Sequence, residues 1–562
     1  MKKPFCLFLA VGMLAASSVK AQDRFSVKFK YKKSDNYSLS NPSAFLSIKA
    51  IERREKQNIE LDSTDLPLNP AYLYALINIP GVTVLNTSKW LNRVLVETSN
   101  AEAINSIDSL PFVARTFRVA ALHKKRPAAN TAAETFGASI PTKKTTAKGI
   151  TSDTIDYGSN YAQVHIHEGQ YLHNKGFRGQ GISIAILDAG FYAYDINPVF
   201  DSVRMNHQVL GEYDFVKKET SVAEDNVHGA NCFSIMAANR PGYIVGTAPK
   251  ASFWLFRTED VSSEKPVEEF NWIEAAERAD SVGADMISSS LGYVNFDDSQ
   301  YNHEYEERDG NTALITIAAD MAAKKGMIVV NAIGNSGNVS NESKYVMCPA
   351  DADSVLTVGA VNSSGIVGKF SSWGPTGLGK VKPNVVSMGE AAVYAKPNGD
   401  PASGNGTSYS TPNIAGLIAC LWQAFNEFSN MEILDAVQRS ADRFNHPDNR
   451  YGYGIPNFET AYSILAAKRL EKANSMLKDK WIVAYPVPFG QQFTVVLKAP
   501  ASGSSTIRLL DANGKILTEK TLQVKEGSHY NVPMYVPLLR KSVYYVQYSD
   551  GANNATLRIV NL

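Results

Sequence analysis

ISIAILDAG, residues 182–190, is an apolar run that ends in a short polar turn at Asp188. Four further apolar runs follow along the chain: SFWLF at 252–256, DMISSS at 285–290, GMIVV at 326–330 and SVLTVGAV at 354–361. Amphipathic helical patterns lie between them. Strands that are apolar along almost their whole length are typical of a parallel sheet covered by helices on both faces. The sequence therefore predicts an α/β domain built on such a sheet.

The overall composition excludes several classes of protein. The chain has 562 residues, with 56 Lys+Arg against 55 Asp+Glu and a formal net charge of +1. This length allows several domains with a full-sized core. The balanced charge gives no general electrostatic case for nucleic-acid binding. Four cysteines are too few for a disulfide scaffold, so function has to be sought in local motifs.

Four polar residues stand where active sites of parallel sheets lie, at or near the carboxyl ends of strands. Asp188 directly follows the first apolar run, and Asn335 lies in the glycine-containing turn after the fourth. His228 opens a helical pattern, and histidine is the general base most easily poised near neutral pH. Ser408 lies where the small-residue loop GNGT at 404–407 enters an apolar helix. Taken singly, Asp188 could be a turn former or helix cap, Asn335 could be required for a turn, and His228 is a weak signal because the chain has nine histidines.

Taken together, the four motifs in the order Asp, His, Asn, Ser resemble the subtilases, the subtilisin-like serine proteases. The resemblance covers about residues 158–470, and further motifs of the family read GTAP at 246–249, SSLG at 289–292, FSSWGP at 370–375 and GYGIP at 452–456. It implies a subtilisin-like parallel sheet with helices on both faces. It also implies a serine endopeptidase that acts on polypeptide substrates.

The resemblance gives each residue a role. Ser408 is expected to attack the peptide carbonyl while His228 takes the proton and Asp188 orients His228. Asn335 and the backbone N–H of Ser408 are expected to stabilise the oxyanion. An edge strand that pairs with the substrate backbone is matched by Ser290, Leu291 and Gly292. A catalytically silent surface-binding protein on the same fold is the alternative, and the intact set of four residues argues against it.

One departure from the family pattern lies after the catalytic histidine. A second histidine usually stands three residues on, where this chain has Asn231 followed by Cys232. Cys232 lies four residues after His228 and so one helical turn along the same face. Some subtilases carry a cysteine at this offset and are sensitive to mercurials. The spacing therefore predicts Cys232 beneath the imidazole, and its thiol is expected to stay outside a disulfide because three cysteines remain after signal cleavage. The resemblance implies that mercurials act on this thiol, and a small buried hydrophobic residue is the alternative.

Metal sites are not predicted. His165, His167 and Glu168 with His173 nearby have the residue types of a metal site, but no further ligand is spaced to complete it. The predicted chemistry needs no cofactor. Family members often carry structural calcium, yet no acidic loop here matches a calcium loop well enough to name ligands.

The N-terminal part has three predicted segments. Residues 1–21 read as a signal peptide because two lysines precede an apolar run shorter than the ~20 residues of a membrane anchor, which is the alternative. Residues 22–120 form a small α+β module. Its place before the catalytic domain indicates an inhibitory propeptide, with a binding module as the alternative. In its first helix Arg53 and Arg54 are expected on the solvent side.

Residues 121–157 are predicted to be a basic linker. Apolar periodicity stops here, and the stretch 123–148 carries six Lys/Arg against one Glu. Such a segment is typically solvated and open to proteolysis, so the propeptide is expected to be released within it. Lys124-Lys125-Arg126 is one candidate for the cut, and the segment up to Tyr157 contains others.

Residues 478–562 are predicted to form a small β-sandwich, since short strands alternate with turns such as Asn513-Gly514. YPVPF at 485–489 and DANGK at 511–515 resemble the type A sorting domains of the type IX secretion route. This implies the outer-membrane secretion machinery as a partner and a secreted or cell-surface protein. The alternative is a stability or substrate-binding module on a periplasmic or plainly secreted enzyme. No later segment offers a transmembrane span.

Overall fold

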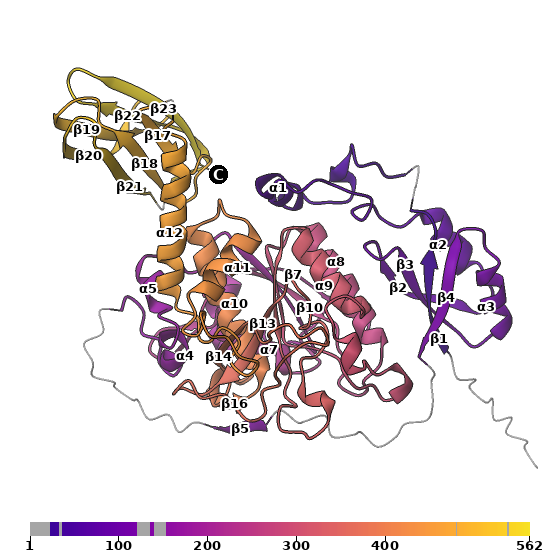
Figure 1. The fold of residues 1–562 in the computed structure, drawn as a ribbon. Helices are drawn as coiled ribbons and strands as arrows, with labels where there is room; N and C mark the ends of the chain where they lie inside the picture. The colour runs from indigo at the N-terminus through magenta and orange to yellow at the C-terminus, as the bar shows by residue number, and fades with distance from the viewer. Residues whose placement is uncertain are drawn as a thin grey trace, which may run out of the picture.

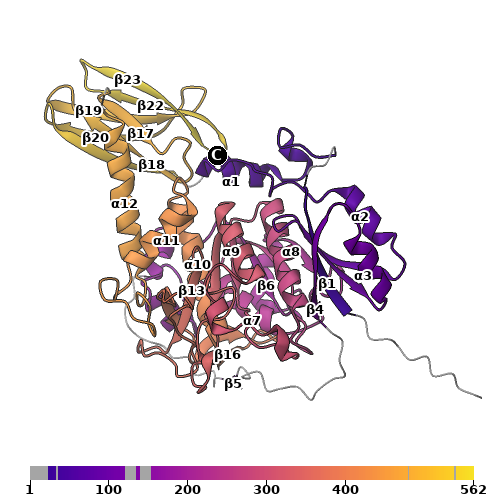
Figure 2. The same cartoon turned by 45° about the vertical axis from the view of Figure 1, so that its right-hand side comes forward.

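The computed structural model describes residues 23–32, 36–120, 135–139, 153–478, 480–536 and 539–561 (Figure 1). The predicted signal peptide and the basic triplet Lys124-Lys125-Arg126 lie outside these residues. Three folded parts follow one another along the chain. An α+β module comes first, a large α/β domain second and a β-sandwich last (Figures 1 and 2).

The α/β domain is built on a seven-stranded sheet in the order β14-β13-β12-β11-β6-β10-β7, and all its pairings are parallel. The strands are β6 Ser183–Asp188, β7 Val209–Asp214, β10 Ser252–Arg257, β11 Met286–Ser289, β12 Ile328–Ala332, β13 Leu356–Val361 and β14 Val385–Met388. The five apolar runs of the sequence form β6, β10, β11, β12 and β13. The predicted parallel sheet is confirmed.

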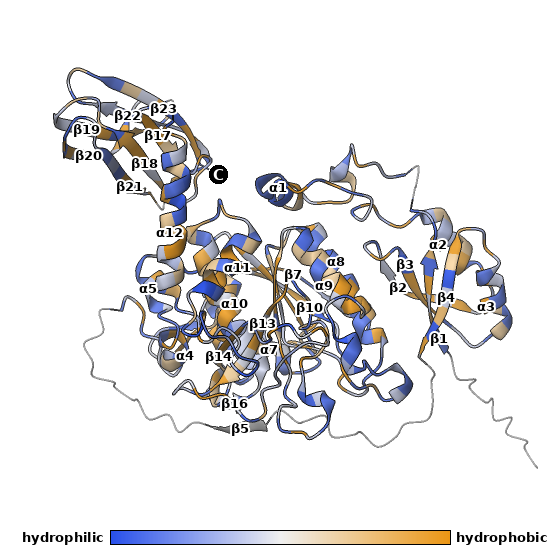
Figure 3. Ribbon diagram, in the orientation of Figure 1, coloured by the Kyte–Doolittle hydropathy of each residue, from blue (hydrophilic) through white to orange (hydrophobic). Residues whose placement is uncertain are grey.

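Helices cover both faces of this sheet, as predicted. Ile184 and Ile186 of β6 belong to one core cluster, with residues of α7 and α10, whereas Ala185 and Leu187 belong to another, with residues of α8 and α9. Since successive side chains of a strand point to opposite faces, β6 must be apolar throughout. Figure 3 shows the same contrast of apolar strands and more polar outer helix faces. The longer helices are α7 His228–Ala237, α8 Val267–Val282, α9 Leu314–Lys324, α10 Thr407–Ala424, α11 Asn430–Arg439 and α12 Phe458–Ser475.

Smaller elements surround the sheet. A hairpin of β15 and β16 leads into α10, and β5 pairs with the outer side of β16. The remaining elements of the domain are β5 Thr135–Ser139, α4 Tyr161–His165, α5 Gln170–Asn174, η2 Pro198–Phe200, α6 Asp201–Met205, β8 Asn239–Arg240, β9 Ile244–Val245, η3 Ser299–Tyr301, η4 Tyr305–Glu307, η5 Glu342–Lys344, β15 Ala392–Ala395 and β16 Pro401–Asn405.

The predicted linker, 121–157, is not solvated along its whole described length. A strand, β5, occupies residues 135–139. Ile155 and Tyr157 are buried and pack with Val164 and Val245 of the α/β domain. The basic charge and the absence of apolar periodicity, on which the linker prediction rests, apply to residues 123–148. They do not predict the apolar contacts that Ile155 and Tyr157 make near the end of the segment.

The N-terminal module has an antiparallel sheet in the order β2-β3-β1-β4. Its elements are β1 Asp23–Phe29, η1 Pro42–Ala44, α1 Ile48–Gln57, α2 Pro70–Ile77, β2 Val82–Ser88, β3 Arg93–Thr98, α3 Ala101–Asp108 and β4 Val113–Ala120. The helix α1 lies apart from this sheet and reaches over the α/β domain (Figure 2). The module therefore touches its neighbour with both its sheet and an extended arm.

The C-terminal part is a sandwich of two antiparallel sheets, in the orders β17-β18-β21 and β20-β19-β22-β23. Both sheets contribute to one core, which includes Phe493 and Val495 from the first and Leu509 and Val546 from the second. Helix α12 connects the sandwich to the α/β domain (Figure 1). The strands of the sandwich are β17 Ile482–Tyr485, β18 Gln492–Lys498, β19 Gly503–Leu510, β20 Ile516–Val524, β21 His529–Tyr535, β22 Ser542–Ser549 and β23 Asn554–Asn561. Within the described residues, none of the helices combines the length and apolar character needed to cross a membrane.

Candidate active site

Asp188 and His228 form a direct pair. Asp188 is the last residue of β6 and is fully buried, and His228 is the first residue of α7. The Nδ1 atom of His228 lies 2.6 Å from Oδ1 of Asp188. A carboxylate in this place holds Nδ1 as the protonated nitrogen, so that Nε2 keeps its lone pair as an acceptor.

Ser408 lies on the Nε2 side of this histidine. It is the second residue of α10, in the first turn of the helix, and its hydroxyl lies 3.3 Å from the carbonyl of Ser290. Cys232 lies between the two: its Sγ is 4.0 Å from His228 Nε2 and 3.3 Å from the Ser408 carbonyl oxygen. The structure thus places Asp188, His228 and Ser408 in one cluster although the sequence separates them widely.

Asn335 is fixed beside Ser408 by Thr407. The backbone N–H of Thr407 donates to Asn335 Oδ1 at 2.8 Å, and the Thr407 hydroxyl lies 3.0 Å from the same oxygen. Because Oδ1 is held in this way, the amide NH₂ group is turned away from Thr407. A fixed amide donor next to a serine at a helix N-terminus can stabilise a developing oxyanion.

The segment Ser290-Leu291-Gly292 follows β11 and lies beside the same helix start. The Ser290 hydroxyl donates to the Ser408 carbonyl at 2.9 Å, and Asn331 Nδ2 donates to the Leu291 carbonyl at 3.0 Å. At Gly292 a Cβ atom would lie 2.5 Å from the side chain of Met347. These contacts hold the segment in a fixed position next to Ser408.

One buried acid near the pair was not identified from the sequence. Glu259 lies two residues after β10, and the Tyr293 hydroxyl donates to its carboxylate at 2.8 Å. Burial raises the pKa of Glu259 to about 7, and the negative charge of Asp188 adds to this rise. Glu259 and Asp260 follow an apolar strand, as Asp188 does, so the sequence carries the same kind of signal at both places. No family motif includes Glu259, and no role was therefore predicted for it from the sequence.

Two clusters of acidic side chains have the ligand types of a cation site. Asp214, Glu219 and Asp225 lie close together, but Arg257 and Lys217 already contact Asp214 and Asp225 at 2.8 and 2.7 Å. Positive side chains therefore take the place that a cation would have there. In the cluster of Glu259, Glu264 and Glu268, both carboxylate oxygens of Glu268 accept backbone N–H groups.

The histidines near residue 170 have protein partners of their own. His165 Nε2 lies 2.9 Å from Asp153, and His173 lies between the Tyr157 hydroxyl and the Thr247 carbonyl. His167 lies between the Pro456 carbonyl and the Ser387 hydroxyl. Burial lowers the pKa of both His167 and His173 to about 4, so both are neutral residues of the core.

The cysteines in the described residues are all buried and none forms a disulfide, and they are Cys232, Cys348 and Cys420. The predictions that Cys232 stays outside a disulfide and lies next to the imidazole are confirmed. Burial raises the pKa of Cys348 and Cys420 well above the usual thiol range. Since the thiolate is the form that reacts, these two are poor targets.

We expect mercuric chloride to inhibit peptide hydrolysis by the wild type, because a mercury ion on Cys232 would displace the imidazole that lies 4.0 Å away. The Cys232→Ala variant should stay active and lose this sensitivity. The matched control is Cys420→Ala, whose thiol lies 3.7 Å from His173, and it should remain sensitive. Equal inhibition of Cys232→Ala and the wild type would contradict the assignment of the target.

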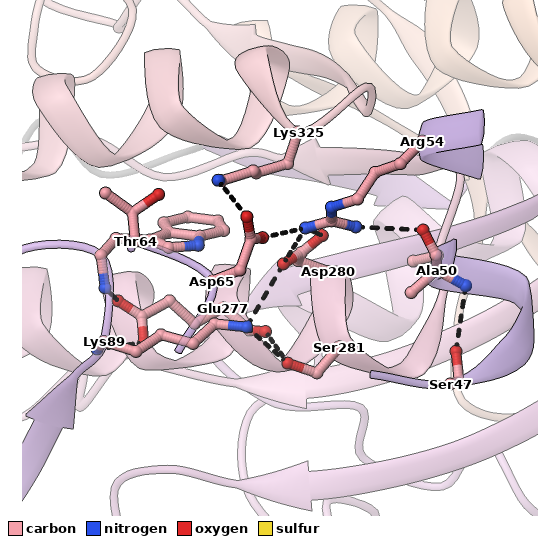
Figure 4. A network of polar contacts seen from close by, with 12 residues as sticks. Ser47, Ala50, Arg54, Thr64, Asp65, Lys89, Glu277, Asp280, Ser281 and Lys325 are labelled. Carbon is pink, nitrogen blue, oxygen red and sulfur yellow. Dashed lines mark hydrogen bonds and ion pairs between the residues drawn. The ribbon is translucent and has the colours of Figure 1, made fainter. Parts of the chain in front are cut away.

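The N-terminal module contacts the α/β domain through two arginines of α1. The Arg53 guanidinium binds Asp280 of α8 and donates to the carbonyl oxygens of Ala284 and Lys325, the latter at 3.1 Å. Arg54 lies 2.8 Å from Asp280 and 2.7 Å from Asp65 (Figure 4). The prediction that these arginines lie on the solvent side is wrong, since both are buried. Their partner Asp280 lies more than 200 residues away in the sequence, so local periodicity could not reveal it.

A second group of contacts converges on Glu277, one turn before Asp280 on α8. Its carboxylate accepts the Ser88 hydroxyl at 2.6 Å, the Lys89 N–H at 2.8 Å and the Trp90 N–H at 3.0 Å. Burial raises the pKa of Glu277 to about 7. The loop between β2 and β3 and the arm α1 therefore occupy neighbouring positions on the same helix.

Comparison with known proteins gives three matches along the chain. Residues 24–134 match the peptidase S8 propeptide domain of Bacteroidota, residues 179–454 match the subtilase family, and residues 483–561 match a secretion system C-terminal sorting domain. The order of the three matches is the order of the three folded parts.

Curated relatives agree with the central match. Subtilisin amylosacchariticus of Bacillus subtilis subsp. amylosacchariticus is 30% identical over 293 residues, which cover 52% of this chain and 68% of that protein. Serine protease AprX of Bacillus subtilis (strain 168) is 27% identical over 339 residues, 55% of this chain and 71% of that protein. Subtilisin Savinase of Lederbergia lenta is 29% identical over 293 residues, 51% of this chain and 93% of that protein. The chain belongs to the subtilase family and is a serine endopeptidase with a propeptide domain before its catalytic domain and a sorting domain after it.

Proposed function

We propose that this endopeptidase hydrolyses peptide bonds with Asp188, His228 and Ser408 as its catalytic triad and Asn335 as its oxyanion donor. The observation that carries the proposal is the 2.6 Å contact between His228 Nδ1 and Asp188, on a ring whose Nε2 faces the Cys232 and Ser408 side. In this arrangement Nε2 is proposed to act as the base for the Ser408 hydroxyl.

In the first half of the reaction Ser408 Oγ attacks the substrate carbonyl carbon. His228 Nε2 takes the hydroxyl proton, and Asp188 stabilises the imidazolium that forms. The same proton then passes from Nε2 to the leaving amine, which departs with the C-terminal part of the substrate. In the second half, water replaces the amine and the acyl-enzyme is hydrolysed by the same transfers in turn.

The oxyanion formed in each half is proposed to be bound by the Asn335 amide and the Ser408 N–H. Asn335 is held by two contacts to Thr407, so little reorganisation is needed when the negative charge develops. Donors fixed in advance are effective for this reason. The N-terminal end of α10 adds positive dipole at the same place.

Substrate is proposed to bind as an extended strand along Ser290, Leu291 and Gly292. Backbone pairing of this kind accepts many sequences and leaves preference to side-chain pockets. Every group in the scheme belongs to the chain itself, so the proposed chemistry calls for no cofactor. Structural calcium remains a proposal without assigned ligands.

The flanking domains indicate where the enzyme works. A sorting domain implies export to the medium or the cell surface. We infer that a signal peptide at residues 1–21 starts this route, that the type IX secretion machinery completes it across an outer membrane, and that the propeptide inhibits the enzyme until it is released. The catalytically silent alternative has no support from the relatives, which are named as proteases and subtilisins.

The Asn335→Ala variant tests the oxyanion assignment. We expect kcat to fall roughly 100- to 1,000-fold with little change in KM, because the amide contributes mainly in the transition state. Steady-state hydrolysis of a peptide substrate measures both constants. Ser336→Ala is the matched control, since it changes the neighbouring side chain and keeps the backbone N–H that donates to Ser372. An unchanged kcat in Asn335→Ala would remove Asn335 from the oxyanion site.

A further inference from the structure

Arg257 is the last residue of β10, the strand that lies between β6 and β7. In the parallel register it stands level with Asp188 of β6 on one side and with Asp214 of β7 on the other. Arg257 is only 6% exposed, so its charge lies inside the domain. A buried guanidinium is costly unless its donors find acceptors. The partners of Arg257 are therefore informative about its role.

The guanidinium of Arg257 contacts both segments that carry the Asp188–His228 pair. Its Nε donates to the carbonyl of Ala189, the residue directly after Asp188, at 3.1 Å. Its Nη1 lies 3.4 Å from Oδ2 of Asp225, which stands three residues before His228. One planar group thus links the turn after Asp188 to the loop before His228.

The charges around this link are balanced by Arg257 from the inside and by Lys217 from the outside. Arg257 Nη1 donates to Oδ2 of the fully buried Asp214 at 2.8 Å, which fixes the guanidinium to β7. Lys217 Nζ lies 2.7 Å from Oδ1 of Asp225, but its side chain is exposed, so water and salt weaken this pairing. Arg257 is therefore the buried cation that compensates both carboxylates.

The two linked segments are in direct contact, so a shift of one is transmitted to the other. A Cβ atom at Gly190 would lie 2.6 Å from the backbone nitrogen of Asn226. A Cβ atom at Gly229 would lie 2.5 Å from the Gly190 carbonyl oxygen and 2.9 Å from Cβ of Asp188. Asn226 Oδ1 in turn accepts the backbone N–H of His228 at 2.8 Å. The separation of Asp188 and His228 therefore follows the relative position of these segments.

We propose that Arg257 is a positioning residue for peptide hydrolysis: by linking Ala189 to Asp225 it holds the His228 imidazole at its working distance from Asp188. The inference rests on the proposed function of that pair and goes beyond it. Among the described residues, the Arg257 guanidinium bonds to none of the triad side chains, so it acts through the segments that carry them. A misplacement of about 1 Å can lower an enzymatic rate ~100-fold, so such a link matters for the rate.

A lysine could not replace this arginine. The contacts to Ala189 and to the two carboxylates leave from different nitrogen atoms of one rigid plane. A lysine ammonium is a single point charge on a flexible stem. The Arg257→Lys variant should therefore keep the buried charge and lose the link, and Arg257→Gln should lose both.

The test measures kcat and KM of both Arg257 variants on a peptide substrate, after an added protease has removed the propeptide from each protein. We expect kcat to fall about tenfold or more in both variants with KM within about twofold of the wild type, because the substrate-binding segment is not touched. Arg278→Gln is the matched control. The Arg278 guanidinium is exposed and lies 6.0 Å from the ring centroid of Phe256, the neighbour of Arg257 in β10, so its loss should leave kcat unchanged. A wild-type kcat in either Arg257 variant would overturn the proposal.

Asp225→Asn tests the other end of the link and decides the question if the Arg257 variants fail to fold. We expect kcat about threefold or more lower, whereas Lys217→Met, which removes the outer partner of Asp225, should leave it unchanged. Asp225→Asn combined with Arg257→Gln should be no slower than Arg257→Gln alone, because both changes break one link. An unchanged kcat in Asp225→Asn, or effects that multiply in the double variant, would overturn the proposal.

His228→Ala separates this inference from the proposed function. If His228→Ala kept the wild-type kcat, the proposed function itself would fail. If His228→Ala lost activity while the Arg257 and Asp225 variants kept the wild-type kcat, only the positioning role of Arg257 would fail.

Discussion

The Ser408→Ala variant should accumulate as a folded, uncleaved precursor and lose peptidase activity by about 10⁶-fold. The reason is that one hydroxyl is proposed to serve both reactions, the release of the propeptide and the hydrolysis of other polypeptides. The methyl group that remains cannot form the acyl-enzyme, and only the oxyanion donors and substrate binding are left. The mass of the purified chain and its rate on a peptide substrate measure the two effects.

Ser410→Ala is the matched control for this variant. Ser410 lies two residues further along the same helix, is buried like Ser408, and donates its hydroxyl to the Thr407 carbonyl at 2.9 Å. Its loss should leave maturation and activity close to wild type. If purified Ser408→Ala precursor matured at the wild-type rate, self-processing through this residue would be excluded.

The Arg53→Met variant should weaken the binding of the cleaved propeptide by about 100-fold or more. The Arg53 guanidinium donates to four acceptors of the catalytic domain: the Asp280 carboxylate and the carbonyl oxygens of Ala284, Lys325 and Asp280. Removing one member of a buried ion pair typically costs about 3–5 kcal/mol, because the other charge stays buried. Arg54 and Lys89 still contact Asp280 here, so the low end of that range applies.

The measurement is the dissociation constant of the cleaved propeptide, obtained from the dilution at which peptidase activity appears. Lys28→Met is the matched control, since it also replaces a positive residue of the same module by methionine, but at an exposed position. It should bind like the wild type. Equal dissociation constants for Arg53→Met and Lys28→Met would show that the buried network does not hold the two parts together.

Much of the fold could be predicted because the relevant signals are local. The run at 182–187 is apolar at every position since β6 is covered on both faces, and Asp188 marks its carboxyl end. The candidate site could be predicted because parallel strands gather their carboxyl ends at one edge. The triad itself came from a resemblance, as Asp188 or His228 alone would not have indicated catalysis.

The features that could not be predicted depend on residues that lie far away in the sequence. Arg53 and Arg54 look like the polar side of a helix until Asp280 is placed beside them. The strand β5 has no apolar pattern of its own and exists as a strand through pairing with β16. Glu259 likewise acquires its raised pKa from burial and from the charge of Asp188, which no local pattern encodes.

Labelling of the mature enzyme with a fluorophosphonate probe, followed by mapping of the modified peptide, tests the central claim most directly. The probe reacts with a serine hydroxyl only where a base activates it. The account predicts one adduct, on Ser408, and at least a hundredfold slower labelling in the His228→Ala variant after an added protease has removed its propeptide, since His228 supplies general-base catalysis of about that size or more. An adduct on another serine, or undiminished labelling of His228→Ala, would contradict the proposed triad.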